Sequence, residues 1–272
     1  RPVISNSNGD GANLTRQSVG DIDDVHQYGG WYTENIRDLR HFGEYTRKND
    51  MLFQPCISTE SIAGYTNDKG EFFCKHSDVR QQKIVALRFG KITDLARQAQ
   101  EYQSFLLKEY SEAMWRLRNP RKLFSGYIPF GQYTWFRKPF GKGKDALVPK
   151  MIWDTYRQVL GPVHVQLECF SRHLFSGGAL KATLRVYHEN IHLPETCSFN
   201  VRIACEGKVL TERVYTIRYH ESIAEELELP LPFANGPHTL KLEVEANGKI
   251  VAENTLAVRI YPAVTFAESK RR

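Results

Sequence analysis

The sequence contains few cysteines, and none lies in a metal-binding arrangement. The five are Cys56, Cys74, Cys169, Cys197 and Cys205. Their number is odd and no two follow Cys-x-x-Cys spacing, which argues against both a zinc site and a disulfide framework. Cys197 and Cys205 form one candidate pair in the second half of the chain, although free buried thiols are the favoured interpretation. We therefore expect no metal ion and no cofactor.

Long apolar runs are also missing from the sequence. No stretch reaches the eighteen or so apolar residues that a membrane-spanning helix needs, so no membrane partner is expected. The apolar content of 41% and aromatic content of 12% are those of a globular protein. The chain opens on Arg1-Pro2 without an initiator Met and without a secretory segment. We therefore expect a processed chain or part of a longer one, and its compartment stays open.

Long runs of residues with the same charge are scarce in the sequence. The net charge is +6, but Lys and Arg alternate with Asp and Glu almost everywhere. The only dense basic runs are Arg137–Lys144 and the tail Lys270–Arg272. A nucleic-acid-binding protein concentrates its cations in a patch or stripe, so we expect no nucleic-acid partner.

Strand and helix patterns alternate from the N-terminus to Leu160. The spacing of apolar and turn-forming residues predicts strands at Val3–Ser5, Asp21–Tyr28, Met51–Thr59 and Leu123–Phe130. It predicts helices at Thr33–Arg47, Thr93–Asn119 and Met151–Leu160, the last with Pro149 near its first turn. The turn-forming cluster Asn6–Gly11 and the polar segment Ser61–Arg88 are predicted loops. Alternation of this kind is typical of a parallel sheet with crossover helices, an α/β fold.

The pattern changes at Gly161-Pro162, after which short alternating runs predict only strands. They are Val163–Leu167, Leu180–Tyr187, Phe199–Cys205, Val214–Arg218, Leu227–Leu231, His238–Ala246 and Ile250–Ile260. Asn247-Gly248 between the last two is a strong hairpin signal. The strand number and spacing predict an all-β, immunoglobulin-like sandwich. We expect two domains, 1–160 and 161–272.

Chemically useful side chains gather after the predicted strands of the first domain. His26, Tyr28 and Trp31 follow the second strand, Glu60 follows the third, and Trp135 follows the fourth. In a β/α barrel the carboxyl ends of the strands converge on one face. One acid among aromatic rings and hydrogen-bond donors suits a sugar, whose ring has an apolar face and a polar rim.

Each of these residues also has a purely structural interpretation. Glu60 can be a solvated acid beyond a strand, because most Glu side chains are exposed. His26 can be a hydrogen-bonded histidine at a strand end, Trp31 can pack between strand and helix, and Trp135 can belong to the core. The argument for a site depends on their appearing together.

Four segments of the chain, in order, resemble motifs of glycoside hydrolase family 2. Arg1-Pro2 is similar to the Arg-Pro that opens the fifth barrel strand of the family, and Asp24–Tyr32 is similar to its sixth-strand motif. Gln54–Glu60 resembles the seventh-strand motif, a Pro followed five residues later by the nucleophilic Glu. Pro149-Lys150 and Gly161-Pro162-Val163 resemble the exit from the barrel into a sandwich.

The resemblance implies strands five to eight of a (β/α)8 TIM barrel followed by an immunoglobulin-like sandwich. It also implies part of a retaining β-glycoside hydrolase, with a carbohydrate as substrate. Glu60 would be the nucleophile and Tyr28 would orient it. His26, Trp31 and Trp135 would bind the substrate.

Two departures from the family pattern are visible. Ser61-Ile62 follows Glu60, where the family places an aromatic residue and a Gly. The acid/base Glu of the family lies upstream of its Arg-Pro, so this chain lacks it. We therefore expect these residues to be an incomplete, inactive portion of the enzyme, with the missing N-terminal half as partner.

Two other functions stay open. One is a non-catalytic carbohydrate-binding or scaffolding protein that keeps a remnant of the barrel, and the other is an enzyme with a different acid/base. Among substrates, the loop Phe140–Lys144 has lysines without the Asn-x-Lys motif of glucuronide-specific relatives. A neutral β-glycoside, a galactoside first, is therefore the expected substrate.

Overall fold

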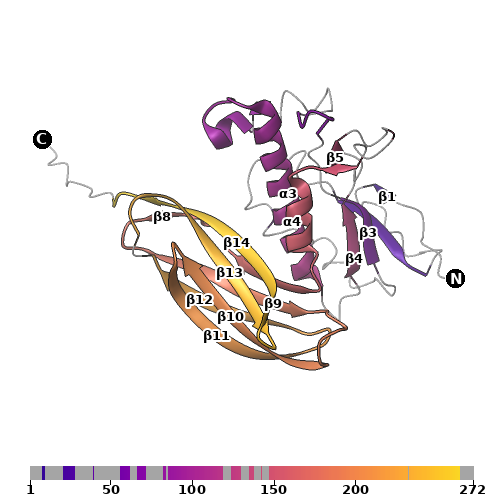
Figure 1. The fold of residues 1–272 in the computed structure, drawn as a ribbon, viewed down its shortest axis with the longest axis vertical. Coiled ribbons are helices and arrows are strands. Elements are labelled where there is room, and N and C mark those ends of the chain that lie inside the picture. The colour runs from indigo at the N-terminus through magenta and orange to yellow at the C-terminus, as the bar shows by residue number, and fades with distance from the viewer. Residues whose placement is uncertain are drawn as a thin grey trace, which may run out of the picture. The chain divides into compact units, whose positions relative to one another are not determined.

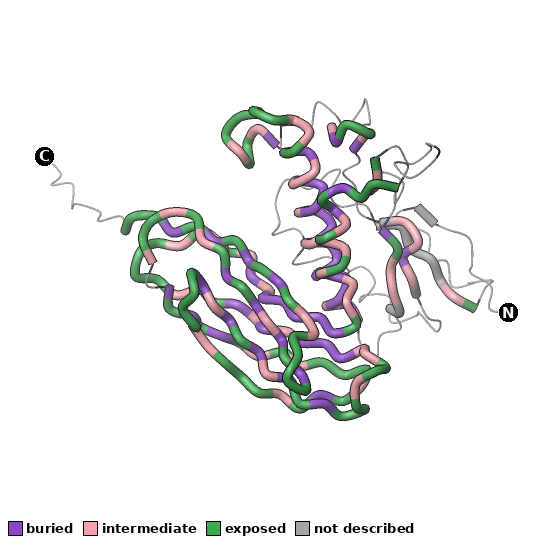
Figure 2. Tube along the Cα trace, viewed as in Figure 1, coloured by how far each residue is buried: buried purple, intermediate pink, exposed green. Residues whose placement is uncertain are grey.

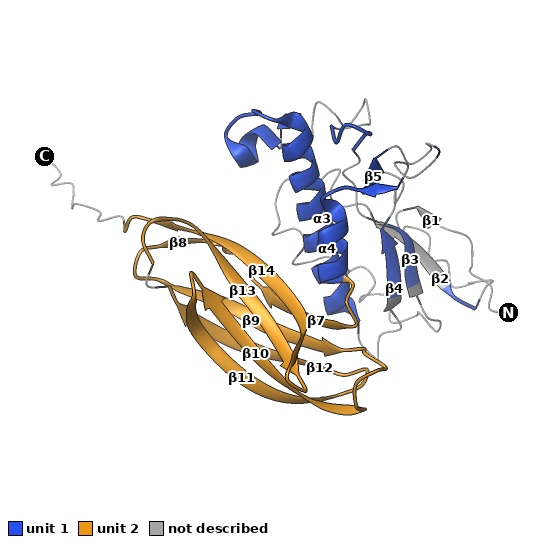
Figure 3. Ribbon diagram, in the orientation of Figure 1, with its two compact units in different colours: residues 1–159 blue, residues 160–272 orange. Residues whose placement is uncertain are grey.

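The computed structural model describes most of the chain in two compact units. The units comprise residues 1–159 and 160–272 (Figure 3). The described residues are 8–9, 21–27, 39, 56–61, 66–71, 82–83, 85–118, 124–129, 135–137, 142, 147–231 and 233–263. Within them strands predominate and helices are few.

The first unit contains a four-stranded parallel sheet (Figure 1). Its strands are β1 (Asn8–Gly9), β2 (Asp23–Gln27), β3 (Cys56–Ser61) and β4 (Phe124–Pro129), in that spatial order. Each pairs in parallel with the next. A parallel pair requires a crossover connection, and a helix between β3 and β4 provides one. The parallel sheet expected from the sequence is therefore present.

Some predictions for this unit were wrong, and others fall outside the described residues. Asn8-Gly9 was predicted as a loop but pairs with Val25 and His26, because neighbouring backbone can compensate for weak strand propensity. The predicted loop to Arg88 is also partly wrong, since residues 85–89 are helical. The strand Val3–Ser5 lies outside the described residues, as does the helix 33–47 except for Leu39.

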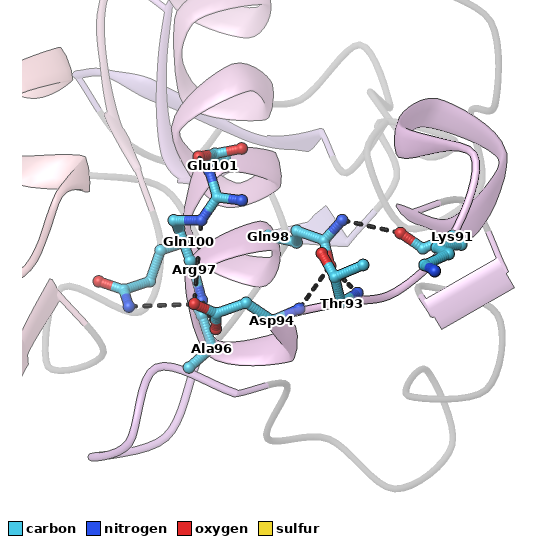
Figure 4. A network of polar contacts seen from close by, with 8 residues as sticks. All are labelled: Lys91, Thr93, Asp94, Ala96, Arg97, Gln98, Gln100 and Glu101. Carbon is cyan, nitrogen blue, oxygen red and sulfur yellow. Dashed lines mark hydrogen bonds and ion pairs between the residues drawn. The ribbon is translucent and has the colours of Figure 1, made fainter.

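The crossover helix α3 (Leu95–Leu117) confirms the clearest helix prediction. Its N-cap is Asp94, whose side chain accepts a hydrogen bond from the Arg97 N–H at 3.0 Å. The Gln98 amide oxygen accepts from the N–H groups of Thr93 and Asp94 (2.9 and 3.1 Å), and its nitrogen donates to the Lys91 carbonyl (Figure 4). These bonds satisfy polar groups that a helix start leaves unpaired.

The helix α4 (Ile152–Val159) lies beside α3 (Figure 1). The Trp115 indole N–H of α3 donates to the Val159 carbonyl of α4 at 2.7 Å, in the protein interior. Before α4, β5 (Phe136–Arg137) pairs with β6 (Val148–Pro149) in antiparallel fashion. Pro149 therefore lies in a strand and not, as predicted, near the first helical turn. Two-residue strands give no periodic signal in a sequence.

The second unit consists of two β-sheets. One has the order β11 (Lys208–Arg218), β10 (Thr196–Cys205), β13 (Gly236–Ala246), β14 (Lys249–Tyr261) and β8 (His173–Phe175). The other has the order β12 (Ser222–Pro230), β9 (Ala179–His188) and β7 (Val163–Glu168). Five of the seven predicted strands match these strands to within three residues at each end, whereas β12 and β11 begin five and six residues earlier than predicted. β8 was missed.

One hydrophobic core lies between the two sheets. Buried and exposed residues alternate along most strands, as Figure 2 shows. Phe199 of β10, Leu184 of β9 and Leu256 of β14 are almost completely buried in this core. Asn254 of β14 is also buried, and its amide donates to the Val165 carbonyl of β7 at 2.6 Å, which links the two sheets.

Two hairpins close on turns that favour glycine. Asn247 and Gly248 have φ values of 52° and 73°, and β13 pairs with β14 around them, which confirms the predicted hairpin. Glu206 and Gly207, with φ of 50° and 79°, close the β10–β11 hairpin in the same way. Two positive φ values indicate a type I′ turn, whose twist matches that of the strands.

The cysteines of the second unit are free thiols. Cys169, Cys197 and Cys205 are all buried. Cys197 and Cys205 lie on the same strand, β10, and eight steps along a strand separate Cα atoms by roughly 26 Å. A disulfide needs Cα atoms within about 7 Å, so this candidate pair is excluded.

His238 of β13 lies between two acceptors and predicts a pH dependence of stability. Its Nδ1 lies 2.7 Å from a Glu206 carboxylate oxygen and its Nε2 lies 2.7 Å from the Ala234 carbonyl oxygen. The Ala234 hydrogen bond, followed by Glu206, raises the pKa of His238. A raised folded-state pKa stabilises the fold below the unfolded pKa, and this stabilisation is lost as pH rises through the folded pKa.

We expect His238→Gln to lower Tm by a few degrees more at pH 5.5 than at pH 8.5. Thermal unfolding followed by circular dichroism measures the difference. The exposed His192 supplies the control His192→Gln, which should show no such pH dependence. Equal losses at both pH values would mean that the pKa of His238 is the same in the folded and unfolded states.

Candidate active site

The carboxyl ends of β2, β3 and β4 form one edge of the parallel sheet. His26 of β2 lies opposite Glu60 of β3, and Gln27 lies opposite Ser61. On the other side Ser61 lies opposite Pro129 at the end of β4. Ligand sites of parallel α/β sheets lie at this edge, because loops of several strands meet there. Two predicted site residues, His26 and Glu60, are thus neighbours across the ladder.

β3 carries one extra residue immediately before Glu60. On the β2 side, Ile57 pairs with Asp24 and Glu60 pairs with His26. Between these two pairs the chain advances three residues along β3 but only two along β2. On the β4 side, three residues of β3 from Ser58 to Ser61 likewise correspond to only two residues of β4. An extra residue seen from both neighbours is a β-bulge.

The bulge lies within β3, which continues through Glu60 to Ser61. Ser58 is fully buried, and its hydroxyl donates to the Glu60 carbonyl oxygen at 3.3 Å. The Glu60 side chain is half-buried. Bulges bend a strand and redirect side chains, and they are enriched beside active sites. The Glu60 side chain is therefore partly shielded from solvent.

Trp135 lies in an aromatic cluster with α4. It is 4% exposed, and its ring centroid lies 4.8 Å from that of Tyr156 and 6.2 Å from that of Trp153. Trp153 and Tyr156 stack at 5.3 Å and 9°. These contacts give Trp135 a packing role. Tyr28 and Trp31, the other predicted aromatic site residues, lie outside the described residues.

Lys150 connects three segments of the first unit. Its Nζ donates to the Thr66 carbonyl oxygen (2.9 Å) and hydroxyl oxygen (3.0 Å), and that hydroxyl donates to Gln103 of α3 (3.0 Å). Its backbone N–H donates to the Trp135 carbonyl at 2.8 Å. Lys150 therefore fixes Thr66, six residues beyond Glu60, against α3 and the segment that carries Trp135.

The environment of Lys150 disfavours its charge. The side chain is buried, and burial lowers its pKa to about 8. The carboxylate of Asp68 opposes this change, while Arg137 adds to it. The burial of Lys150 was not predicted, since a single lysine after a proline gives no local sign of burial.

Tyr127 of β4 was also missed. Burial raises the pKa of its phenol well above the ordinary value, with further contributions from Tyr156 and Glu112 and an opposing one from the Ser111 hydroxyl. The phenol therefore stays neutral at physiological pH. An aromatic residue in an apolar strand has the pattern of an ordinary core residue, so nothing in the sequence indicated that the environment of Tyr127 is unusual.

The described part of the chain contains no group of three or more His, Cys, Asp or Glu side chains that could hold a metal ion. In the same residues no helix has both the length and the apolar character needed to cross a membrane.

Comparisons with known proteins identify no family. No protein-family model matches the sequence, and no curated protein matches it. Among solved structures, β-glucuronidase 2 of Bacteroides uniformis, as a calcium-binding mutant, is 15% identical over 94% of this chain and 28% of its own, with a TM-score of 0.32.

Two other solved structures resemble smaller parts of the chain. The CARDB domain of a Pyrococcus furiosus protein is 11% identical and covers 36% of this chain and 85% of its own (TM-score 0.31). A β-glucosidase of Listeria innocua is 9% identical and covers 38% of this chain and 16% of its own (TM-score 0.28). All three TM-scores lie below 0.5, so these likenesses carry no argument about function.

Proposed function

We propose that this chain forms part of a retaining β-glycoside hydrolase in which Glu60 is the nucleophile. The observation that carries the proposal is the position of Glu60. It lies directly after a bulge at the carboxyl end of an inner strand of a parallel sheet, opposite His26. The site motifs in the sequence resemble those of glycoside hydrolase family 2 at these same positions.

In this mechanism the Glu60 carboxylate attacks the anomeric carbon of a β-glycoside while an acid donates a proton to the departing oxygen. The product is a covalent α-glycosyl ester of Glu60. The same acid/base then removes a proton from water, which attacks the anomeric carbon, releases Glu60 and restores the β-configuration. A retaining enzyme holds its two carboxyl groups about 5 Å apart.

The surrounding residues take supporting roles in this proposal. Tyr28 hydrogen-bonds Glu60 and orients it, and His26, Trp31 and Trp135 contribute to the sugar site. The acid/base comes from a polypeptide segment beyond these 272 residues. The parallel sheet is then strands five to eight of a TIM barrel spanning 1–160, and 161–272 is an immunoglobulin-like domain.

A mechanism-based label tests the assignment. A 2-deoxy-2-fluoro-β-glycosyl fluoride slows breakdown of the glycosyl-enzyme more than its formation, so the intermediate accumulates. We expect the longest natural polypeptide containing these residues to gain one sugar, attached to the peptide that carries Glu60, as measured by mass spectrometry. Galacto-, gluco- and manno-configured labels compared side by side identify the sugar. A label on another carboxylate would overturn the assignment.

The second candidate is a non-catalytic carbohydrate-binding or scaffolding protein. The burial of Trp135 among Trp153 and Tyr156 gives this residue a packing role, which favours the scaffolding form of this candidate, in which the parallel sheet is only structural. Such a protein would take up no label, and the variant of Glu60 described in the Discussion separates the two candidates directly.

A further inference from the structure

A second group of aromatic side chains lies in the second unit, where β8 pairs with the end of β14. The pairing is parallel, with His173 opposite Arg259, Leu174 opposite Ile260, and Phe175 opposite Tyr261. Ile260 is buried in the core and Leu174 packs against it, so the alternating residues face outward. We call His173, Phe175, Arg259 and Tyr261 the aromatic platform.

The aromatic platform is exposed, although most aromatic residues of globular proteins are largely buried. Phe175 is 59% exposed and Tyr261 is 38% exposed. The His173 and Tyr261 rings meet edge to face at 5.5 Å. Neighbouring strands lie roughly 5 Å apart, so the Phe175 and Tyr261 side chains stand side by side. Their combined width suits a pyranose ring.

Backbone hydrogen bonds order the aromatic platform. The Ser176 N–H donates to the Tyr261 carbonyl and the Arg259 N–H donates to the Arg172 carbonyl, both at 2.8 Å. Beyond β8 the chain turns at once, with Gly177 at a φ of 81°. Side chains on an ordered ladder lose little conformational entropy when a ligand binds. The platform is thus preorganised for a flat ligand.

The charge on this sheet face is distributed unevenly. Farther along the same face, Lys241 pairs with Glu243 and Glu253 at 2.7 and 2.9 Å, and Arg202 lies 3.8 Å from Glu212. At the platform, Arg259 has no carboxylate partner among the described residues, and its guanidinium carbon lies 5.7 Å from the Tyr261 ring centroid. One cation beside exposed rings therefore remains available to an anion.

We propose that the aromatic platform binds an acidic glycan, with a uronic-acid ring lying on Phe175 and Tyr261 and its carboxylate on Arg259. The apolar face of the sugar covers the exposed rings, and the guanidinium donates two hydrogen bonds to the carboxylate. This site is separate from Glu60 and does not depend on the proposed hydrolase activity.

Single-stranded nucleic acid is the competing ligand for a surface of rings and cations. Such ligands require a track of cations along their phosphates. On this face the next cations, Lys241 and Arg202, are already paired with glutamates. A single free arginine suits one carboxylate, not a run of phosphates.

Titration of the full chain with tetragalacturonate tests the proposal by calorimetry or NMR. We expect a Kd of about 0.1 to 1 mM, typical of a small exposed site. Tyr261→Ala should weaken binding by about tenfold. Arg259→Gln should weaken it similarly and remove the preference for tetragalacturonate over its methyl ester. Arg202→Gln, on the same face, should leave binding unchanged.

Several outcomes would overturn the proposal. They are no binding by the wild type at several millimolar, equal affinity for the acid and its methyl ester, and tighter binding of oligothymidylate. Binding that is unchanged in Tyr261→Ala would place the ligand elsewhere and equally reject the platform. Circular dichroism of each variant verifies that the surface substitutions leave the fold intact.

Discussion

Replacing Glu60 by glutamine should lower kcat for an aryl β-glycoside by about three to six orders of magnitude. The amide keeps the size of the side chain but cannot form the glycosyl ester. KM and ligand affinity should change far less, because the sugar contacts remain. The rate is measured in the longest natural polypeptide that contains these residues. Arg1–Arg272 alone should show no appreciable turnover, since the proposed acid/base lies outside it.

Two further measurements make this result specific. Glu60→Ala with added azide should regain activity and give the α-glycosyl azide, because azide enters the space left by the carboxylate. Glu101→Gln, on the surface of α3, is the matched control and should retain the wild-type rate. If Glu60→Gln kept its activity to within fivefold, the nucleophile would be wrong. If neither protein hydrolysed any glycoside while both bound sugar equally, the binding-protein alternative would hold.

Sequence patterns predicted the helices, hairpins and strands that are determined by residues close together in the sequence. The helix at Leu95–Leu117 follows from apolar residues at steps of three and four, with Asp94 as a cap. The hairpin at Asn247-Gly248 follows from two residues that accept positive φ. The strands of the second unit follow from strict alternation over a shared core. In each case the signal lies within a few residues of the element it predicts.

Features created by contacts between distant segments could not be predicted in this way. The bulge before Glu60 exists only relative to β2 and β4, because register is a property of paired strands. β8 is three residues long and depends on β14 for its hydrogen bonds. Lys150 donates a hydrogen bond to Thr66, which lies 84 positions away in the sequence, and no local sequence pattern indicates this contact. The likeness of site motifs selected Glu60 as a candidate but gave no indication of the bulge before it.

Lys150 should make the first unit more stable as pH rises from 7 to 10. Its pKa in the folded state is about 8, against an ordinary value of 10.5. Between these values the folded state has released the proton while the unfolded state still binds it, so unfolding becomes less favourable as pH rises. Below pH 8 the buried ammonium lowers the free energy of unfolding by its full amount, and above pH 10.5 this destabilisation disappears. The change between pH 7 and 10 amounts to a few kcal/mol.

The variant Lys150→Met isolates this effect, because the methionine fills similar space without titrating. The free energy of unfolding of the wild type should rise by a few kcal/mol relative to Lys150→Met between pH 7 and 10. Tryptophan fluorescence during urea unfolding measures it, since all four tryptophans lie within residues 1–159. Lys91→Met, at an exposed lysine, should follow the wild type at every pH. Parallel curves for wild type and Lys150→Met would mean that the amine keeps an ordinary pKa. In that case the surroundings of Lys150, including its contact with Thr66, would not disfavour the charged form of the amine.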